Sequence, residues 1–203
     1  MSIIKIPCID QTRHWPTGCE SATAVMLLQA LGVPMTMERW VQDFLECRDF
    51  TKAAGQLIGP DPRKFFAGDP ADPDGMGCWS GALARFLNKA FTVLELPYRA
   101  LAADGAAPQM LRESLQNGIP AAYWATIDAK PAIPGPDWLL EDSGEVFHWR
   151  SNEHCMLLVG MDEENYWFND PLHAACSPAP WPKALAEQRH AEQGNMTVLV
   201  KPV

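Results

Sequence analysis

Two patterns of apolar residues alternate along the chain, and they predict where helices and strands lie. Apolar side chains three or four positions apart predict helices, whereas short apolar runs between turn-forming residues predict strands. Helical patterning dominates the first half of the chain and strand patterning the second half. The expected helices cover residues 19–31, 36–47, 79–90, 108–117 and 181–193; the expected strands cover residues 3–9 (a strand or an extended arm), 91–97, 119–126, 146–149, 154–161, 165–169 and 196–200.

Helices followed by strands predict an α+β arrangement, in which an N-terminal helical half packs on an antiparallel β-sheet. Gly32 and Pro34 end the first helix, and Thr36 is the expected N-cap of the second. A length of 203 residues suits one domain, spanning residues 1–203. The groove between the two halves is the expected place for a site.

Two segments are dense in turn-forming residues and interrupt the regular pattern. Residues 55–77 contain repeated Gly, Pro and Asp, and residues 128–144 contain three prolines. Irregular segments of this length in a compact domain are commonly functional. We therefore expect these two segments to form the walls of the groove.

The charge pattern narrows the classes of partner. The net charge is −9 and Lys and Arg do not cluster, which excludes a nucleic-acid-binding surface. An acidic surface also disfavours anionic membranes. No apolar stretch reaches the length of a spanning helix, and residues 1–10 do not resemble a signal peptide. We therefore expect a cytoplasmic protein with no membrane partner, or a secreted one if an export signal has been trimmed.

The cysteine pattern does not predict a metal site. The six cysteines have irregular spacings and form no CxxC pair, so we expect no zinc or other metal site. One of them, Cys155, lies inside an apolar run, where buried free thiols are common. We expect all six thiols to be reduced, and we expect no cofactor.

One cysteine has the setting of a nucleophile. Cys19 follows Gly18 at the start of a predicted helix, where the helix dipole and unpaired N–H groups favour a thiolate. His154 begins an apolar strand later in the chain and would serve as general base and acid. A cysteine at a helix start followed by a histidine on a strand is the chain order of papain-type thiol hydrolases. The pair is expected to rest as thiolate and imidazolium.

The histidine needs a third group to fix its ring, and two neighbouring residues compete for that role. Asp170 and Asn169 both end the strand expected to pair with that of His154. Adjacent strand residues point to opposite faces, so only one of them can face the ring. Asp170 is our choice. His14, close before Cys19, is the reserve base.

The oxyanion of an acyl-transfer reaction needs hydrogen-bond donors. The backbone N–H of Cys19 is one, and the side-chain amide of Gln11, eight residues upstream, is the expected second. Glu20, next to the nucleophile, is interpreted as compensating the helix dipole.

Taken together, these segments resemble the bacterial peptidase C39-like family, a papain-fold group. The resemblance implies that Cys19 is the nucleophile, His154 the base and acid, Asp170 its orienter and Gln11 an oxyanion donor. It also implies a papain-like antiparallel sheet. The residues that carry it are Gln11, 16–21 (PTGCES), 59–62 (GPDP), 68–70 (GDP), 124–126 (WAT), 153–162 (EHCMLLVGMD) and 169–171 (NDP).

These features predict a cysteine peptidase-like hydrolase that cleaves a peptide or amide bond in a peptide or protein substrate. The same triad also serves acyltransferases and transglutaminases, in which an amine replaces water, and sequence does not separate these activities. A papain-like module that binds peptides without cutting them is the alternative of a different class. The presence of Cys19, His154 and Gln11 together counts against that alternative.

Overall fold

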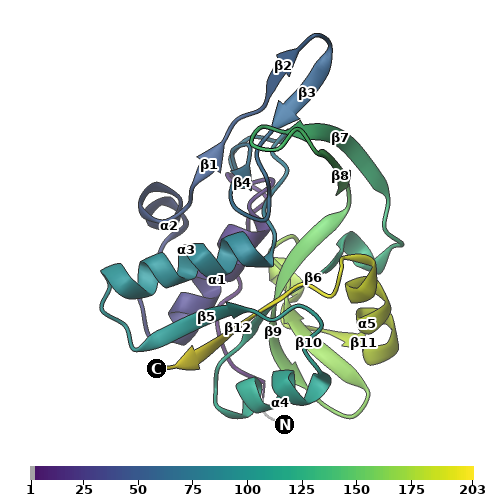
Figure 1. The fold of residues 1–203 in the computed structure, drawn as a ribbon. Coiled ribbons are helices and arrows are strands. Elements are labelled where there is room, and N and C mark those ends of the chain that lie inside the picture. Colours follow the sequence, from purple (N-terminus) through teal and green to yellow (C-terminus); the bar gives the residue numbers. More distant parts are fainter. Residues whose placement is uncertain (1–2) are drawn as a thin grey trace.

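A six-stranded antiparallel sheet organises the protein. The structure is a computed structural model that describes residues 3–203. The strands follow the order β11-β10-β9-β6-β12-β5, so β9 and β6 occupy the centre (Figure 1). Their bounds are β5 (Tyr98–Ala102), β6 (Ala121–Thr126), β9 (Glu153–Met161), β10 (Asn165–Asn169), β11 (Ala179–Pro182) and β12 (Thr197–Pro202).

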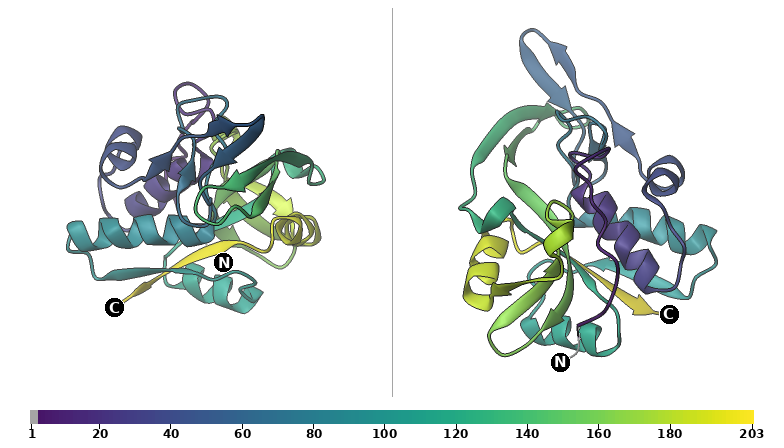
Figure 2. Two further views of the ribbon diagram at one scale, coloured as in Figure 1. Left: turned by 45° about the horizontal axis from the view of Figure 1, so that its top comes forward. Right: turned by 180° about the vertical axis from the view of Figure 1, so that it is seen from behind.

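Helices cover both faces of this sheet. The first three, α1 (Cys19–Ala30), α2 (Met37–Asp43) and α3 (Ser80–Val93), lie on one face, and α4 (Pro108–Gln116) and α5 (Lys183–Glu192) lie on the other (Figures 1 and 2). Successive side chains of β9 point alternately to the two faces of the sheet, so β9 contributes to the apolar core on each face. Cys155 and Leu157 pack in the core with α1 and α3, whereas Met156 and Leu158 pack with α4. Within residues 3–203, no helix is long and apolar enough to span a bilayer.

A smaller sheet stands beside the large one. Its order is β2-β3-β7-β8, and its bounds are β2 (Thr51–Ala53), β3 (Gln56–Gly59), β7 (Pro134–Leu140) and β8 (Val146–Arg150). It has its own aromatic core, in which the Trp138 ring packs against Phe147 and Trp149. The β2–β3 hairpin projects from the body of the protein (Figure 1). A short parallel pair, β1 (Cys47–Arg48) with β4 (Phe66–Ala67), lies near its base.

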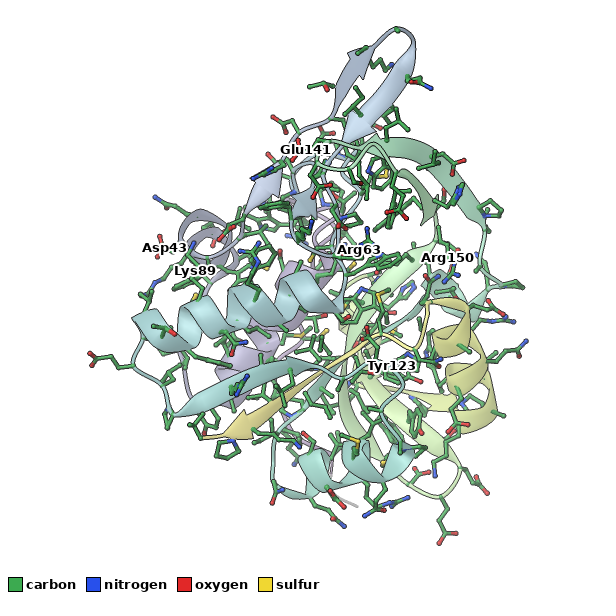
Figure 3. The ribbon with its side chains drawn as sticks, viewed as in Figure 1. Asp43, Arg63, Lys89, Tyr123, Glu141 and Arg150 are labelled. Carbon is green, nitrogen blue, oxygen red and sulfur yellow. The ribbon has the colours of Figure 1, made fainter. Side chains whose placement is uncertain are left out.

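Side chains lie densely between the helices and the large sheet (Figure 3). Tyr123, labelled in Figure 3, projects from β6 and stacks on the buried ring of His190, whose Nδ1 lies 2.7 Å from the carbonyl oxygen of Trp124. The last turns of α5 thereby pack on the middle of β6, on the face opposite α1. This packing leaves α1 and β9 to meet on the other face, where the candidate site lies.

The observed architecture confirms the expected α+β class, in which α1 to α3 form the N-terminal helical layer. The sequence predicted helices near α4 and α5 but not their position relative to the sheet; in the structure they cover its second face. Residues 3–9 form an extended arm that runs beside the sheet, where the Ile4 N–H donates to the Val159 carbonyl oxygen at 2.8 Å. All six cysteines are free thiols, as expected.

Three expected elements differ from the structure. The strand expected at residues 91–97 is wrong, because Phe91 continues the buried face of α3 and the strand, β5, begins at Tyr98. The expected helix at 36–47 is shorter and ends at Asp43, although Thr36 caps it as predicted by accepting the Arg39 N–H at 3.2 Å. Residues 128–144 leave the large sheet as expected, but include β7 of the smaller one.

Candidate active site

Cys19 is the first residue of α1, where the helix meets the end of the large sheet. Its side chain is 7% exposed and borders a cavity. The first N–H groups of a helix have no partner within the helix, so the N–H of Cys19 is available to a ligand. Gly18 precedes the helix and packs closely on Trp15 and Pro70, so that an added Cβ would lie 3.1 Å from the Cβ of Trp15. The local sequence therefore fixes the position of the thiol.

His154 and Asp170 form a buried pair beside this helix. His154 lies on β9 and Asp170 directly follows β10, its antiparallel neighbour. The Nε2 atom of His154 is 2.7 Å from Oδ1 of Asp170, and both side chains are almost completely buried. The same carboxylate oxygen accepts the N–H of Leu172 at 2.9 Å.

These contacts explain the acidity of Asp170. Burial alone would raise its pKa, but the hydrogen bond and charge of His154, together with the Leu172 N–H, hold the pKa below its ordinary value. The carboxylate is therefore ionised near neutral pH and accepts the ring N–H, so the Nδ1 atom of the imidazole is the one left for a reacting group.

Two alternative candidates from the sequence, Asn169 as the orienting group and His14 as the base, lie away from the His154 ring and the cavity, respectively. The side chain of Asn169 turns away and donates from Nδ2 to the carbonyl oxygen of Ile6 at 3.0 Å, which ties down the N-terminal arm. His14 is exposed and does not border the cavity. Of the candidates weighed for partnership with His154, the structure therefore places Asp170 at the ring.

Gln11 lies in the loop that precedes α1. It is buried and borders the same cavity as Cys19 and His154. Its Nε2 donates to the carbonyl oxygen of Pro16 at 3.1 Å, and its backbone N–H donates to Pro171. The loop between Gln11 and Gly18 thus folds back as expected and brings the side-chain amide to the helix start.

The cavity has a volume of about 290 Å³. Its walls come from the two irregular segments singled out in the sequence, together with β8 and the start of β9, as expected for the groove. The lining residues are Gln11, Pro16, Thr17, Cys19, Pro73, Asp74, Gly75, Met76, Ile127, Pro136, Trp149, Ser151, Glu153, His154 and Leu172.

The thiol does not bond to the imidazole in this structure. Its hydrogen-bond acceptor is instead Glu20, whose Oε2 is 3.2 Å from Sγ of Cys19, and the Cys155 N–H approaches the sulfur at 3.5 Å. Burial, with the negative charges of Glu20 and Glu153, raises the pKa of the Cys19 thiol well above its ordinary value. The expected thiolate–imidazolium resting pair is therefore not the state seen, because two carboxyl groups adjoin the sulfur.

Glu20 does more than compensate the helix dipole. It is fully buried, and its Oε1 accepts the N–H of Cys78 at 2.7 Å, which anchors the segment that lines the cavity. Gly77 packs so closely on this carboxyl that a Cβ there would lie 2.3 Å from Oε1. Burial raises the pKa of Glu20 to about 7, despite the hydrogen bonds from Cys78 and Cys19.

Glu153 was not singled out from the sequence. Because it alternates with His154 along β9, its side chain shares a face with Cys155 and approaches α1. Burial, and then the charge of Glu20, raise the pKa of Glu153 well above its ordinary value. Cys19, Glu20 and Glu153 form the one group of three potential metal-ligating side chains found among residues 3–203. The sequence signal that could have identified Glu153 is its position as a charged residue directly before His154, at the start of an apolar strand.

Comparisons with known proteins agree with this fold. Residues 3–194 match the profile of the Peptidase_C39 like family. The fold is similar to a crystal structure of a candidate C39-like peptidase from Bacillus anthracis, with a TM-score of 0.80 and 21% sequence identity. That similarity covers 100% of this chain and 98% of the other, and at this identity it establishes the fold alone. No curated protein sequence matches the chain.

Proposed function

The chain belongs to the peptidase C39-like family, and from that premise we propose that it is a cysteine peptidase that cleaves a peptide or amide bond through Cys19, His154 and Asp170. The observation that carries the proposal is one cavity bordered by Cys19, Gln11 and His154, behind which Asp170 holds the histidine ring at 2.7 Å. Nucleophile, base, orienting group and oxyanion donor are thus all present at one helix start.

The first step requires the thiol to leave Glu20. Rotation about the Cα–Cβ bond of Cys19 turns the sulfur from Glu20 toward the free Nδ1 of His154. The ring accepts the thiol proton, and Asp170 stabilises the imidazolium that results. The thiolate then attacks the substrate carbonyl carbon, and the N–H of Cys19 and the amide of Gln11 stabilise the oxyanion.

The remaining steps return the residues to their starting state. The imidazolium of His154 protonates the leaving amine as the carbon–nitrogen bond breaks, which leaves a thioester on Cys19. Water enters, gives a proton to His154 and attacks the thioester. The carboxylic acid product departs, and the proton returns from the ring to the sulfur. No other chemical group is needed.

A peptide-library assay tests this proposal. The wild-type protein is incubated with mixed peptides, new N-termini are identified by mass spectrometry, and Cys19→Ala and His154→Ala are measured beside it. Cys47→Ser, at an exposed position that does not line the cavity, is the matched control and should keep full activity. We expect cleavage in the wild type and the control, and none with Cys19→Ala or His154→Ala.

The same assay separates the alternative chemistries. Acyl transfer would appear as a product joined to an added primary amine, with little free acid. A binding module would retain peptides but produce neither product. Cleavage that survives Cys19→Ala would contradict the proposal outright.

A further inference from the structure

Two carboxyl groups and a thiol converge at the base of the cavity. The ligand atoms of Cys19, Glu20 and Glu153 all lie within 4.8 Å of one another. These three side chains are 7%, 0% and 8% exposed, respectively. Cys19 and Glu153 border the cavity directly, so a small solute in the cavity can reach the cluster. The cluster does not include His154 or Asp170, which pair with each other beside it.

No cationic side chain compensates this carboxyl pair in the part of the chain that the structure describes. Elsewhere a buried carboxylate has such partners: Asp61 is 4% exposed and pairs with Arg63 at 2.7 Å. Glu20 and Glu153 form no comparable ion pair among residues 3–203, and the buried Oε1 of Glu153 has no hydrogen-bond partner. Buried charges without partners are costly, so the site favours a bound cation.

We propose that Cys19, Glu20 and Glu153 form a binding site for a zinc-type divalent cation. Thiolate and carboxylate oxygen are both ordinary zinc ligands, and ligand atoms around tetrahedral zinc lie roughly 3.3–3.8 Å apart. The observed separation of 3.2 Å between Sγ of Cys19 and Oε2 of Glu20 is close to that range. Small side-chain movements bring Glu153 to the same ion, and the cavity leaves the fourth position open to water.

The surroundings of Glu20 orient it for this role. Its Oε1 is held by the Cys78 N–H at 2.7 Å, so Oε2 is directed at the sulfur. Groups that hold a metal ligand in place in this way strengthen metal binding. The sulfur makes the site selective, because Mg²⁺ and Ca²⁺ prefer oxygen ligands and larger coordination numbers.

The consequence for activity rests on the proposed function. As the metal–sulfur bond forms, the thiol proton leaves to solvent, and a sulfur lone pair is donated to the metal. The sulfur can then neither turn toward His154 nor attack a carbonyl carbon. A bound ion would therefore hold the peptidase in a reversible inactive state, and a chelator would restore activity.

Titration with Cd²⁺, a spectroscopic substitute for zinc, tests binding without using activity. A cadmium–thiolate bond gives an ultraviolet charge-transfer band. The exposed thiols Cys47 and Cys176 are replaced by serine throughout, so that they contribute no signal. We expect one saturable band, absent in Cys19→Ser and competed away by Zn²⁺ but not by Mg²⁺.

Single variants identify the remaining ligands. We expect Glu153→Gln to weaken Cd²⁺ binding by roughly 10–100-fold, at least the loss caused by removing an outer partner of a metal ligand. Glu20→Gln should have a similar effect and serves as the second variant if one of the two folds poorly. His154→Ala should leave the affinity unchanged. If His154→Ala abolishes binding and Glu153→Gln does not, a cysteine–histidine pair holds the ion and the proposal is overturned.

Peptide cleavage is measured independently of Cd²⁺ binding, so that failure of the metal site and failure of the proposed peptidase activity can be distinguished. A saturable Cd²⁺ band without cleavage of any peptide would support the metal site and count against the proposed peptidase. Cleavage that Zn²⁺ does not inhibit, together with the absence of the band, would support the peptidase and overturn the metal site.

Discussion

Asp170 holds the ring of His154 by a 2.7 Å contact between Oδ1 and Nε2, at the junction of β9 and the residues that follow β10. The neighbouring side chain of Asn169 reaches a different partner, the Ile6 carbonyl oxygen. Adjacent residues of an extended segment point to opposite faces, so only one of the two can face the ring. The identity of the third group thus follows from the alternation of side chains at the end of β10.

Replacing Asp170 by Asn should therefore lower kcat steeply. The amide cannot stabilise an imidazolium and can favour the wrong tautomer of the ring, which in a serine–histidine–aspartate triad costs about 10⁴-fold. We expect a loss of roughly 10²–10⁴-fold here, measured as kcat on the best library peptide. The fold should persist, as checked by circular dichroism.

Asn169→Ala is the matched control for this substitution. Its amide bonds to the Ile6 carbonyl oxygen rather than to the ring, so its loss should reduce stability but leave kcat nearly unchanged. A silent Asp170→Asn combined with an inactive Asn169→Ala would reverse the assignment.

Glu20 should make the stability depend on pH in the direction opposite to that of most carboxylates. Its pKa is raised from an ordinary 4.5 to about 7, so the folded protein keeps a proton that the unfolded chain releases. The contribution of Glu20 to stability is then fully present below about pH 4.5 and is lost as the pH rises to about 7. From the pKa difference, we expect this contribution to the free energy of unfolding to decrease by about 3 kcal/mol over that window.

Glu20→Gln isolates this contribution. Denaturant unfolding of both proteins, with a chelator present, should show a difference between them that changes with pH between 4.5 and 7. Parallel stability curves for the wild type and the variant would show that Glu20 is not the group responsible.

The fit of Gly77 against Glu20 predicts a third effect. An alanine Cβ at this position would lie 2.3 Å from Oε1 of Glu20, and the backbone φ of +127° is unfavourable for any other residue. Gly77→Ala should displace Glu20, release the Cys78 N–H and cost roughly 1–3 kcal/mol or more of unfolding free energy. Thermal and denaturant unfolding measure this loss.

Gly32→Ala is the control for backbone strain alone. Its φ is also positive, at +82°, but nothing lies within 4 Å of the added Cβ. We expect a loss of about 1 kcal/mol from the left-handed conformation and no effect on thiol reactivity. Equal losses in the two variants would mean that the contact between Gly77 and Glu20 contributes nothing.

Local sequence signals were enough to select Cys19 and His154, which the structure brings to one cavity. A cysteine after glycine at a helix start, and a histidine at the head of an apolar strand, are recognisable without knowledge of distant contacts. The contact of Glu153 with Cys19 was not predictable in this way, because it depends on which face of β9 packs against α1. The expected strand at 91–97 failed for a related reason, since a short apolar run fits a buried helix equally well.

Gln11 provides the last prediction, because its place at the cavity can be explained by packing or by catalysis. Its Nε2 donates to the Pro16 carbonyl oxygen, so Gln11→Ala removes both a loop contact and a proposed oxyanion donor. Loss of one such donor lowers kcat by roughly 10²–10³-fold, and we expect about 10²-fold with little change in KM. Gln11→Glu keeps the size of the side chain but can no longer donate when ionised, so it should be as inactive as Gln11→Ala. Both variants also lose the donation to Pro16, so stability is measured beside kcat. If either variant loses stability but keeps near-normal kcat, Gln11 supports the loop rather than stabilising the oxyanion.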